Sequence, residues 1–238
     1  YNFGACYFRD EGVVPLQNYT RYNLRAALDQ QVGKIFKFGF NLNQSYSVTN
    51  GNNLGLYGVL SASPIANPFD ADGTLKSRIQ QQTSGQQWVH TRQSYEALGD
   101  SYVNQQRVFG SYNNMYGEIR IPGVEGLTYR TNLGLNFRQN NDGSYTGQGV
   151  FSGTPDNVST ASVANGRTVQ WVMENLLTYD RTFAQKHNLN LVALYSAEQN
   201  TSNSTLISGR DIPIDAFQFY NIGRAQGEII VNPDQQGY

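Results

Sequence analysis

Acidic residues are the first place to look for catalytic chemistry in this sequence. Four carboxylates could be imagined in a glycoside hydrolase: Asp10, Glu11, Asp211 and Asp215. Such an enzyme needs two carboxyl groups held at a fixed gap across a cleft, and nothing in the spacing of these residues orders them that way. His90 and His187 are the only histidines, which leaves little material for a hydrolytic triad. The sequence therefore predicts a protein that is neither an enzyme nor dependent on a cofactor.

One short segment, Phe69–Gly73, carries two carboxylates two residues apart, Asp70 and Asp72. Oxygen ligands at this spacing occur in calcium-binding loops. The rest of an EF-hand pattern is missing, including the glutamate that completes such a loop. The alternative is a simple turn, which Asp and Gly residues form readily. This pair is a weak calcium candidate, and the sequence indicates no other metal site.

Aromatic side chains are candidates for binding a sugar or a partner protein. Trp88, Tyr95 and Tyr102 fall in a long polar stretch that we expect to be a loop. Exposed rings in a loop can stack on sugars or anchor a second protein. The alternative is a small hydrophobic cluster that folds the loop on itself, and the sequence leaves both open.

The composition indicates what kind of element positions these residues. Of the 238 residues, 13% are aromatic and only 15% are charged. A disordered chain would lack so many aromatic residues, and a soluble domain usually has roughly a quarter charged residues. No apolar run approaches the ~20 residues of a membrane helix, whereas a membrane β-barrel needs none, because only every second residue meets lipid. The net charge of −1 gives no reason to expect a nucleic-acid partner, and the single cysteine, Cys6, excludes a disulfide within the chain.

Alternation of apolar and polar residues is the strongest structural signal. It predicts seven antiparallel strands, at 1–9, 19–29, 34–47, 105–121, 126–138, 167–181 and 188–198. Most exceed the average of about 5–6 residues in soluble strands and approach or exceed the ~9–11 residues of a tilted membrane strand. Six apolar residues are expected to face outward: Phe36, Phe38, Phe40, Leu133, Leu135 and Phe137. The fold class is thus all-β, a fragment of a large transmembrane barrel.

The connections between these strands fall into two alternating classes. Three are short, around 30–35, 122–126 and 182–187, while two are long, Val48–Asn104 and Asn140–Gly166. A third long connection is expected to begin at Ser202, with no strand after it. Outer-membrane barrels have short periplasmic turns and long extracellular loops. Because bacterial single-chain barrels have even strand numbers, we expect neighbouring strands in sequence beyond both ends of this chain.

A family resemblance is carried by several blocks that occur in order along nearly the whole chain. The stretch YFRDEGVVPLQNYTRYNLRAALDQQVGKIFKFGFNLNQSYS resembles the first barrel strands of SusC-like (SusC/RagA) TonB-linked outer-membrane proteins of Bacteroidetes. The block SASPIANPFDADGTL resembles one of their loops, and GLTYRTNLG and ENLLTYDRTF resemble later strand–turn blocks. Any one block is weak, but together they are specific to this family.

The resemblance implies a barrel of about 22 strands filled by a plug domain. It further implies multi-pass insertion in the bacterial outer membrane and TonB-driven import of glycans or peptides. A SusD-like surface lipoprotein is the implied partner. Residues 1–238 are expected to form part of one barrel domain, without residues assignable to energy coupling. On this interpretation Arg21, Arg25 and Arg138 face the lumen, with Arg130, Glu174 and Asp180, where they could contact substrate, contact the plug or be hydrated.

Two other functions remain open at this stage. One is a passive porin or adhesin-type barrel that works without TonB. The other is a surface β-domain that binds carbohydrate through Trp and Tyr. A soluble β-domain would bury Phe36, Phe38 and Phe40, whereas a barrel would point them at lipid.

Overall fold

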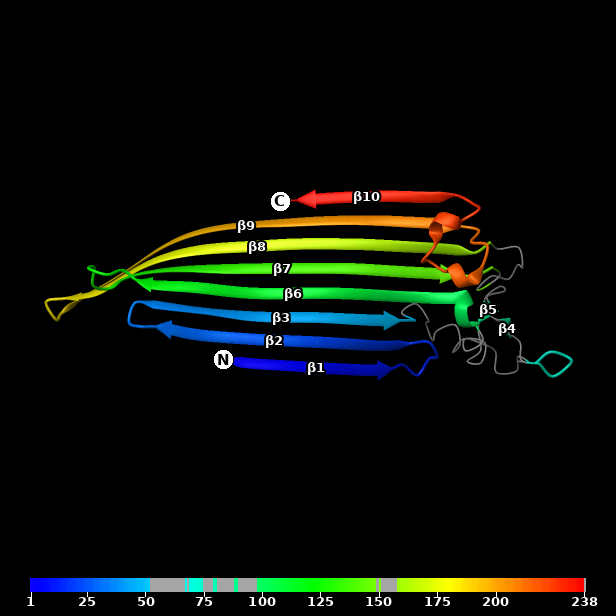
Figure 1. Cartoon of the computed structure of the whole chain (residues 1–238), viewed down its shortest axis with the longest axis horizontal. Helices are drawn as coiled ribbons and strands as arrows, with labels where there is room; N and C mark the ends of the chain where they lie inside the picture. The colour runs from blue at the N-terminus through cyan, green and yellow to red at the C-terminus, as the bar shows by residue number, and fades with distance from the viewer. Residues whose placement is uncertain are drawn as a thin grey trace.

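The computed structural model describes residues 1–51, 67, 69–74, 79–80, 88–89, 98–148, 150 and 158–237. Eight strands in chain order form one antiparallel sheet (Figure 1). They are β1 (Asn2–Glu11), β2 (Asn18–Val32), β3 (Phe36–Asn50), β6 (Tyr102–Arg120), β7 (Leu127–Thr146), β8 (Thr160–Phe183), β9 (His187–Arg210) and β10 (Ile229–Gly237). A separate ribbon pairs β4 (Ile79–Gln80) with β5 (Trp88–Val89). Over the described ranges, no helix is long and apolar enough to cross a membrane.

The prediction of seven strands is wrong by one, because β10 was missed. The sequence of β10 contains Pro233 and alternates only briefly, but a strand at the edge of a sheet tolerates proline. The loop expected from Ser202 is also wrong, since β9 continues to Arg210. Residues 199–205 are polar on both faces, and the apolar Leu206 and Ile207 are adjacent, so the segment gives no apolar alternation. Its backbone nevertheless pairs with β8 throughout.

The sorting of the connections is confirmed, with shorter loops than predicted. Short turns at 33–35, 121–126 and 184–186 lie at one end of the sheet, hereafter the turn end (left in Figure 1). At the other end, hereafter the loop end, lie the strand ends that the connections 12–17, 51–101, 147–159 and 211–228 join. The strands extend three residues into each end of the predicted loop Val48–Asn104 and seven residues into each end of Asn140–Gly166.

The two faces of the sheet differ in character, as the alternation predicted. Cross-strand partners share a face, and Phe40 pairs with Met115, which pairs with Leu133. We call this side the apolar face; it carries all six residues predicted to face outward. The opposite face, hereafter the polar face, carries the alternate residues of each strand, among them Lys37 of β3 and Arg130 of β7. Phe36 is 41% exposed and Leu135 is 37% exposed, so the described residues leave part of the apolar face uncovered.

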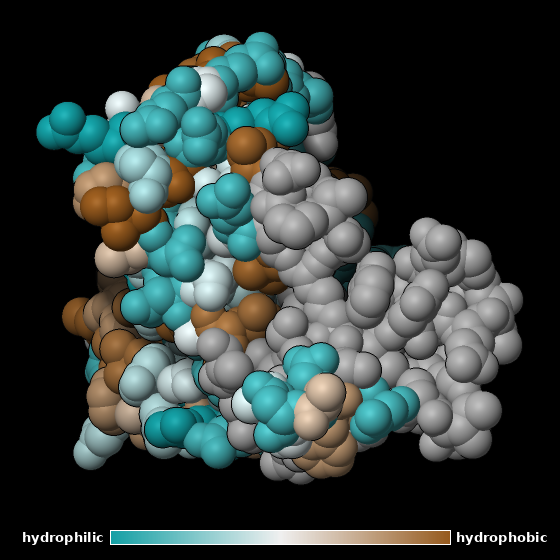
Figure 2. All heavy atoms as spheres, turned by 90° about the vertical axis from the view of Figure 1, so that its right-hand side faces the viewer, coloured by the Kyte–Doolittle hydropathy of each residue, from teal (hydrophilic) through white to brown (hydrophobic). Residues whose placement is uncertain are grey.

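Within the described part of the chain, the buried hydrophobic residues gather at the loop end. One cluster pairs Val14 with Tyr102, and the other contains Tyr145, Ala161, Ile212 and Ile222. The second forms because the connection 211–228 folds back over the apolar face; we call it the capping segment. It includes η2 (Asp215–Phe217) and η3 (Ile222–Arg224). Figure 2 looks onto the loop end and shows hydrophobic and hydrophilic residues interspersed over its described surface.

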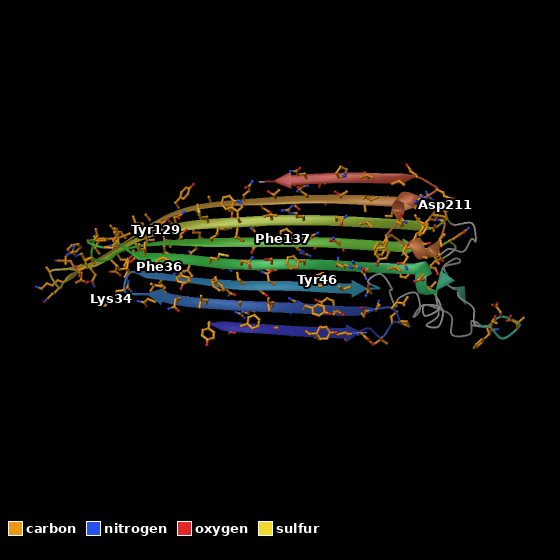
Figure 3. All side chains as sticks on the ribbon, viewed as in Figure 1. Lys34, Phe36, Tyr46, Tyr129, Phe137 and Asp211 are labelled. Atoms are coloured by element: carbon orange, nitrogen blue, oxygen red, sulfur yellow. The ribbon has the colours of Figure 1, made fainter. Side chains whose placement is uncertain are left out.

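Figure 3 shows where the labelled residues lie along the length of the sheet. Phe36 and Tyr129 lie near the turn end, while Tyr46 and Phe137 lie farther toward the loop end. Asp211, at the start of the capping segment, lies at the loop end itself. The apolar face therefore extends over most of the strand length before the capping segment covers it.

Candidate functional site

Arginines on the polar face are held along their own strands by asparagines. In each of three Arg-x-Asn triplets, the Arg Nε donates a hydrogen bond to the Asn Oδ1 two residues later. The distances are 2.9 Å for Arg21 to Asn23, 2.9 Å for Arg130 to Asn132, and 3.1 Å for Arg138 to Asn140. Residues i and i+2 of a strand share a face, which makes this contact possible. Each guanidinium is thereby oriented through its Nε, which leaves its terminal nitrogens to contact other groups.

A tyrosine near the turn end lies across a glycine on the polar face. Gly39 of β3 is the direct partner of both Asp29 of β2 and Tyr116 of β6. The Tyr116 hydroxyl donates to Asp29 Oδ1 over the top of Gly39. A Cβ at position 39 would come within 2.5 Å of Tyr116 Cε1 and 2.8 Å of Asp29 Oδ1. Only glycine leaves room for this bridge across three strands.

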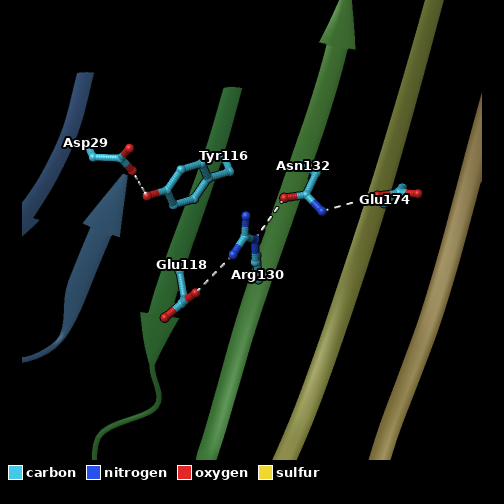
Figure 4. Close-up of polar contacts among 6 residues, drawn as sticks. All are labelled: Asp29, Tyr116, Glu118, Arg130, Asn132 and Glu174. Atoms are coloured by element: carbon cyan, nitrogen blue, oxygen red, sulfur yellow. Dashed lines mark hydrogen bonds and ion pairs between the residues drawn. The ribbon is translucent and has the colours of Figure 1, made fainter. Parts of the chain in front are cut away.

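The bridge continues into a group of charged and polar side chains that spans β2, β6, β7 and β8 (Figure 4). The Arg130 guanidinium lies 4.3 Å from the Tyr116 ring centroid and 3.6 Å from Glu118 Oε2. Asn132, which accepts from Arg130, donates to Glu174 Oε2 at 3.2 Å. We call this group the Arg130 cluster; its members are Asp29, Tyr116, Glu118, Arg130, Asn132 and Glu174.

The Arg130 cluster borders a hollow of about 460 Å³ on the polar face. Asn41 and Asn114 complete its polar lining, and Lys37 lies 5.5 Å from the Tyr116 ring centroid. The carboxylates of Asp29 and Glu174 and the guanidinium of Arg130 thus line a space that also offers amide donors and acceptors. Such a surface suits a polar partner that carries both charges and amides. In the residues that the structure describes, no group of three or more His, Cys, Asp and Glu could hold a metal ion.

The other candidate residues fall in different places. Arg21, Arg25 and Arg138 lie on the polar face, as expected, but on separate parts of it. The interpretation of Tyr102 as an exposed loop residue is wrong: it is the first residue of β6 and is buried beside Val14. Tyr102 belongs to the sheet because its backbone pairs with Thr146 of β7.

The remaining aromatic candidates are less well defined. Trp88 begins β5, although its side chain lies outside the described residues, as does all of Tyr95. Their role in contacting a sugar or a partner therefore stays a prediction.

The two carboxylates proposed for calcium lie in a turn. Asp72 Oδ1 accepts hydrogen bonds from the Thr74 hydroxyl at 2.7 Å and from the Thr74 N–H at 3.0 Å. The side-chain bond, followed by the backbone bond, lowers the pKa of Asp72 below its usual value. The Gly73 N–H donates to the Asp70 carbonyl at 3.0 Å. These bonds account for the Asp and Gly residues as turn formers, and calcium binding stays a prediction.

Sequence reasoning did not single out four members of the Arg130 cluster. Asp29, Tyr116, Glu118 and Asn132 are common residue types in unremarkable surroundings. The usable signal is the pairing of Gly39 with Tyr116, a small residue opposite a large one. That signal appears only once the register between β3 and β6 is known.

The fold and the two faces define a class: a fragment of a large antiparallel β-barrel. No protein-family model matches the chain. The chain is similar to TonB-dependent receptor P3 of Formosa agariphila, with 23% identity over 93% of this chain and 22% of the relative. TonB-dependent receptor P39 of the same organism is 25% identical over 90% of this chain and 20% of its own length. The chain thus spans about a fifth of these relatives.

Solved structures share the fold. A structure described as the RagAB peptide transporter matches with a TM-score of 0.70 and 19% identity, over 97% of this chain and 26% of that one. The RagAB peptide importer in its "closed-closed" state matches with a TM-score of 0.69 and 18% identity, over 99% of this chain and 26% of that one. The resemblance to SusC-like TonB-linked proteins inferred from the sequence is confirmed, as a match to part of a barrel.

Proposed function

We propose that residues 1–238 form part of the wall of one TonB-dependent receptor barrel in the outer membrane of a bacterium. The whole protein would import nutrient oligomers, glycan or peptide, with a SusD-like lipoprotein. The observation that carries this proposal is the division of the sheet into an uncovered apolar face and a charged polar face. An uncovered apolar face needs lipid around it, and a charged face suits a water-filled lumen. The similarity to TonB-dependent receptors supports the energy source.

The polar face supplies the part of the transport path that this chain contributes. The oriented guanidiniums of Arg21, Arg130 and Arg138 would offer donors to carboxylates or carbonyl oxygens passing along the wall. The carboxylates of the Arg130 cluster would accept from cationic or amide groups. A peptide carries all of these groups, and the RagAB structures are described as a peptide transporter and importer. The same surface would serve equally well as the seat of a plug domain.

The test is uptake by a bacterium that expresses the intact protein as its sole receptor of this type. We expect Glu118→Gln/Arg130→Gln to lower the uptake of labelled peptides several-fold, because it removes one ion pair and one oriented guanidinium. Arg181→Gln is the matched control, since Arg181 lies at the turn end on the apolar face and pairs with exposed Glu125 at 3.3 Å. Labelled oligosaccharides run in parallel would identify the substrate class. Uptake that continues without TonB would favour the passive porin instead.

The loop end is the expected seat of the lipoprotein. The resemblance to SusC-like proteins implies such a partner, and the long loops of outer-membrane barrels are extracellular. Replacing residues 81–97 by a glycine–serine linker should weaken co-purification of such a partner. The replacement spares η1 (Gly99–Ser101), where the Ser101 carbonyl accepts from the Gly147 N–H at 2.7 Å. An unchanged complex would place the main contact on another part of the barrel.

A further inference from the structure

Charged side chains are nearly absent from the apolar face of the eight strands. Its one acidic residue is Glu11, which pairs with Arg9 at 2.6 Å. Arg181 pairs with Glu125 in the neighbouring turn. Two further cations share this face, Arg107 of β6 and Arg167 of β8. Neither has an ion-pair partner among the residues that the structure describes.

Both arginines lie at the edge of an aromatic row that crosses the apolar face. Ring centroids are 5.1 Å apart for Tyr7 and Tyr22, 6.5 Å for Tyr22 and Tyr46, and 6.0 Å for Phe109 and Phe137. The Arg167 guanidinium lies 5.5 Å from the Phe137 ring centroid. Arg107 lies two residues from Phe109 toward the loop end, on the same face.

The height of this row matches one boundary of a membrane. From Phe36 to Tyr46, both on the apolar face of β3, the strand advances ten residues, or ~34 Å at ~3.4 Å per residue. At the ~40° tilt of barrel strands, this corresponds to a height of ~25 Å, the height of the apolar band of outer-membrane barrels. Aromatic girdles mark the two edges of that band. Arg107 and Arg167 therefore stand at the level of the lipid headgroups on the loop side.

Polar amides fill the space between the two arginines. They belong to β7, which separates β6 from β8: Gln139 is the partner of Arg167, and Asn141 is the partner of Arg107. Gln139 Nε2 lies 3.4 Å from Asn141 Oδ1, its hydrogen-bond acceptor. With strands ~4.8 Å apart and the two arginines offset by two residues along the sheet, their backbones are separated by ~12 Å. Side chains as long as arginine can converge on one group over that span.

The capping segment closes this surface toward the loop end. Phe219 lies over Gly143, the next apolar-face residue of β7 after Asn141; a Cβ at position 143 would come within 2.4 Å of the ring. The result is a shelf with aromatic rings on its turn side and a protein cover on its loop side. We call it the arginine ledge; its residues are Arg107, Gln139, Asn141 and Arg167.

We propose that the arginine ledge binds the phosphate group of a lipid in the outer leaflet, a proposal that rests on the outer-membrane location proposed above. Guanidinium groups form charge-assisted, bidentate hydrogen bonds with phosphate oxygens. The lipid's acyl chains run from that point along Phe137, Leu135 and Leu133, the successive apolar-face residues of β7. Charge complementarity selects a phosphorylated headgroup, because no acidic side chain of the apolar face lies near the ledge.

The test is native mass spectrometry of the intact protein, purified from outer membranes in mild detergent, with added lipid A that carries two phosphates. We expect Arg107→Gln/Arg167→Gln to weaken retention of this lipid by roughly tenfold or more, the loss expected from charge-assisted hydrogen bonds. Arg120→Gln/Arg210→Gln removes the same charge from the polar face and should leave retention unchanged. Heat-modifiable migration on gels establishes that each barrel is folded. Arg107→Lys/Arg167→Lys, which keeps the charge, should fall between the two.

Three outcomes would overturn the proposal. The first is equal retention by the double glutamine variant. The second is equal binding of lipid A without phosphates, which would show that only the acyl chains matter. The third is that millimolar inorganic phosphate displaces bound lipid A as effectively as further lipid A does, which would indicate a site for free anions. Lipid binding and transport are separate measurements. Uptake that does not depend on TonB, found together with intact lipid binding, would count against the proposed function alone.

Discussion

Two glycines of this sheet lie beneath aromatic rings, on opposite faces and toward opposite ends. On the polar face near the turn end, Gly39 admits the ring of Tyr116. On the apolar face near the loop end, Gly143 admits the ring of Phe219. The first ring comes from the neighbouring strand and joins the Arg130 cluster. The second comes from a connection and, with Ile222, builds a small hydrophobic core.

The difference shows what surrounds each part of the sheet. Where strands rise past the aromatic row, the chain covers its own apolar face with the capping segment, and Tyr145 there is only 1% exposed. Below that row, Phe36 and Leu135 stay open to their surroundings. A soluble protein would need other residues to cover the apolar face on both sides of the aromatic row, because large exposed apolar patches are rare on soluble monomers. Lipid at the lower level, as proposed above, would account for the contrast.

The largest effect should come from a charge placed in the uncovered part of the apolar face. Leu133→Arg is expected to lower the free energy of unfolding by about 2–4 kcal/mol if the site is near the membrane midplane. Asn41→Arg is the matched control on the polar face, where it should cost much less because the polar hollow solvates it. Folding of the intact protein into lipid vesicles under denaturant measures both. Equal costs would mean that the assignment of the two faces is wrong.

A smaller effect should follow from closing the gap beneath Tyr116. Gly39→Val places a side chain against Tyr116, Asp29 and the Leu28 carbonyl oxygen, which lies 2.8 Å from the ideal Cβ. A backbone atom cannot easily move away, so we expect a loss of roughly 1–3 kcal/mol. Gly117→Val is the control, since its Cβ would meet only Thr131 Cγ2 at 3.9 Å. Denaturant unfolding in vesicles compares them, and similar losses would show that the Tyr116 bridge contributes nothing specific.

The sequence predicted the sheet far better than the contacts on it. Period-two alternation was enough for the assignment of Phe38 and Leu133 to one face, because a strand shows its two faces directly in its sequence. It was not enough for β10 or for the capping segment, whose burial comes from packing against strands distant in sequence. The Arg130 cluster could not be predicted for the same reason, because the hydrogen bond from Tyr116 to Asp29 joins residues 87 positions apart. Local pattern determines strands, whereas register and loop folding determine sites.

The smallest effect should come from loosening the capping segment without disturbing the strands. The Tyr145 hydroxyl donates to Asp215 Oδ1 at 2.6 Å, and Tyr145→Phe removes this bond while keeping the ring in place. Because water can solvate the exposed Asp215 carboxylate, the loss should be only about 1 kcal/mol. That corresponds to roughly fivefold faster amide hydrogen exchange in residues 211–228, if those amides exchange by local opening.

The same substitution at another tyrosine of β7 provides the control. Tyr129 lies near the turn end, and its hydroxyl donates to Asn175 Oδ1 at 2.7 Å. Tyr129→Phe should leave exchange in residues 211–228 unchanged. If Tyr145→Phe also leaves it unchanged, then the packing of Phe219 and Ile222 alone holds the segment. If both variants speed exchange throughout the sheet, the capping segment does not open independently of the strands, and the contrast between the covered and uncovered levels loses its energetic basis.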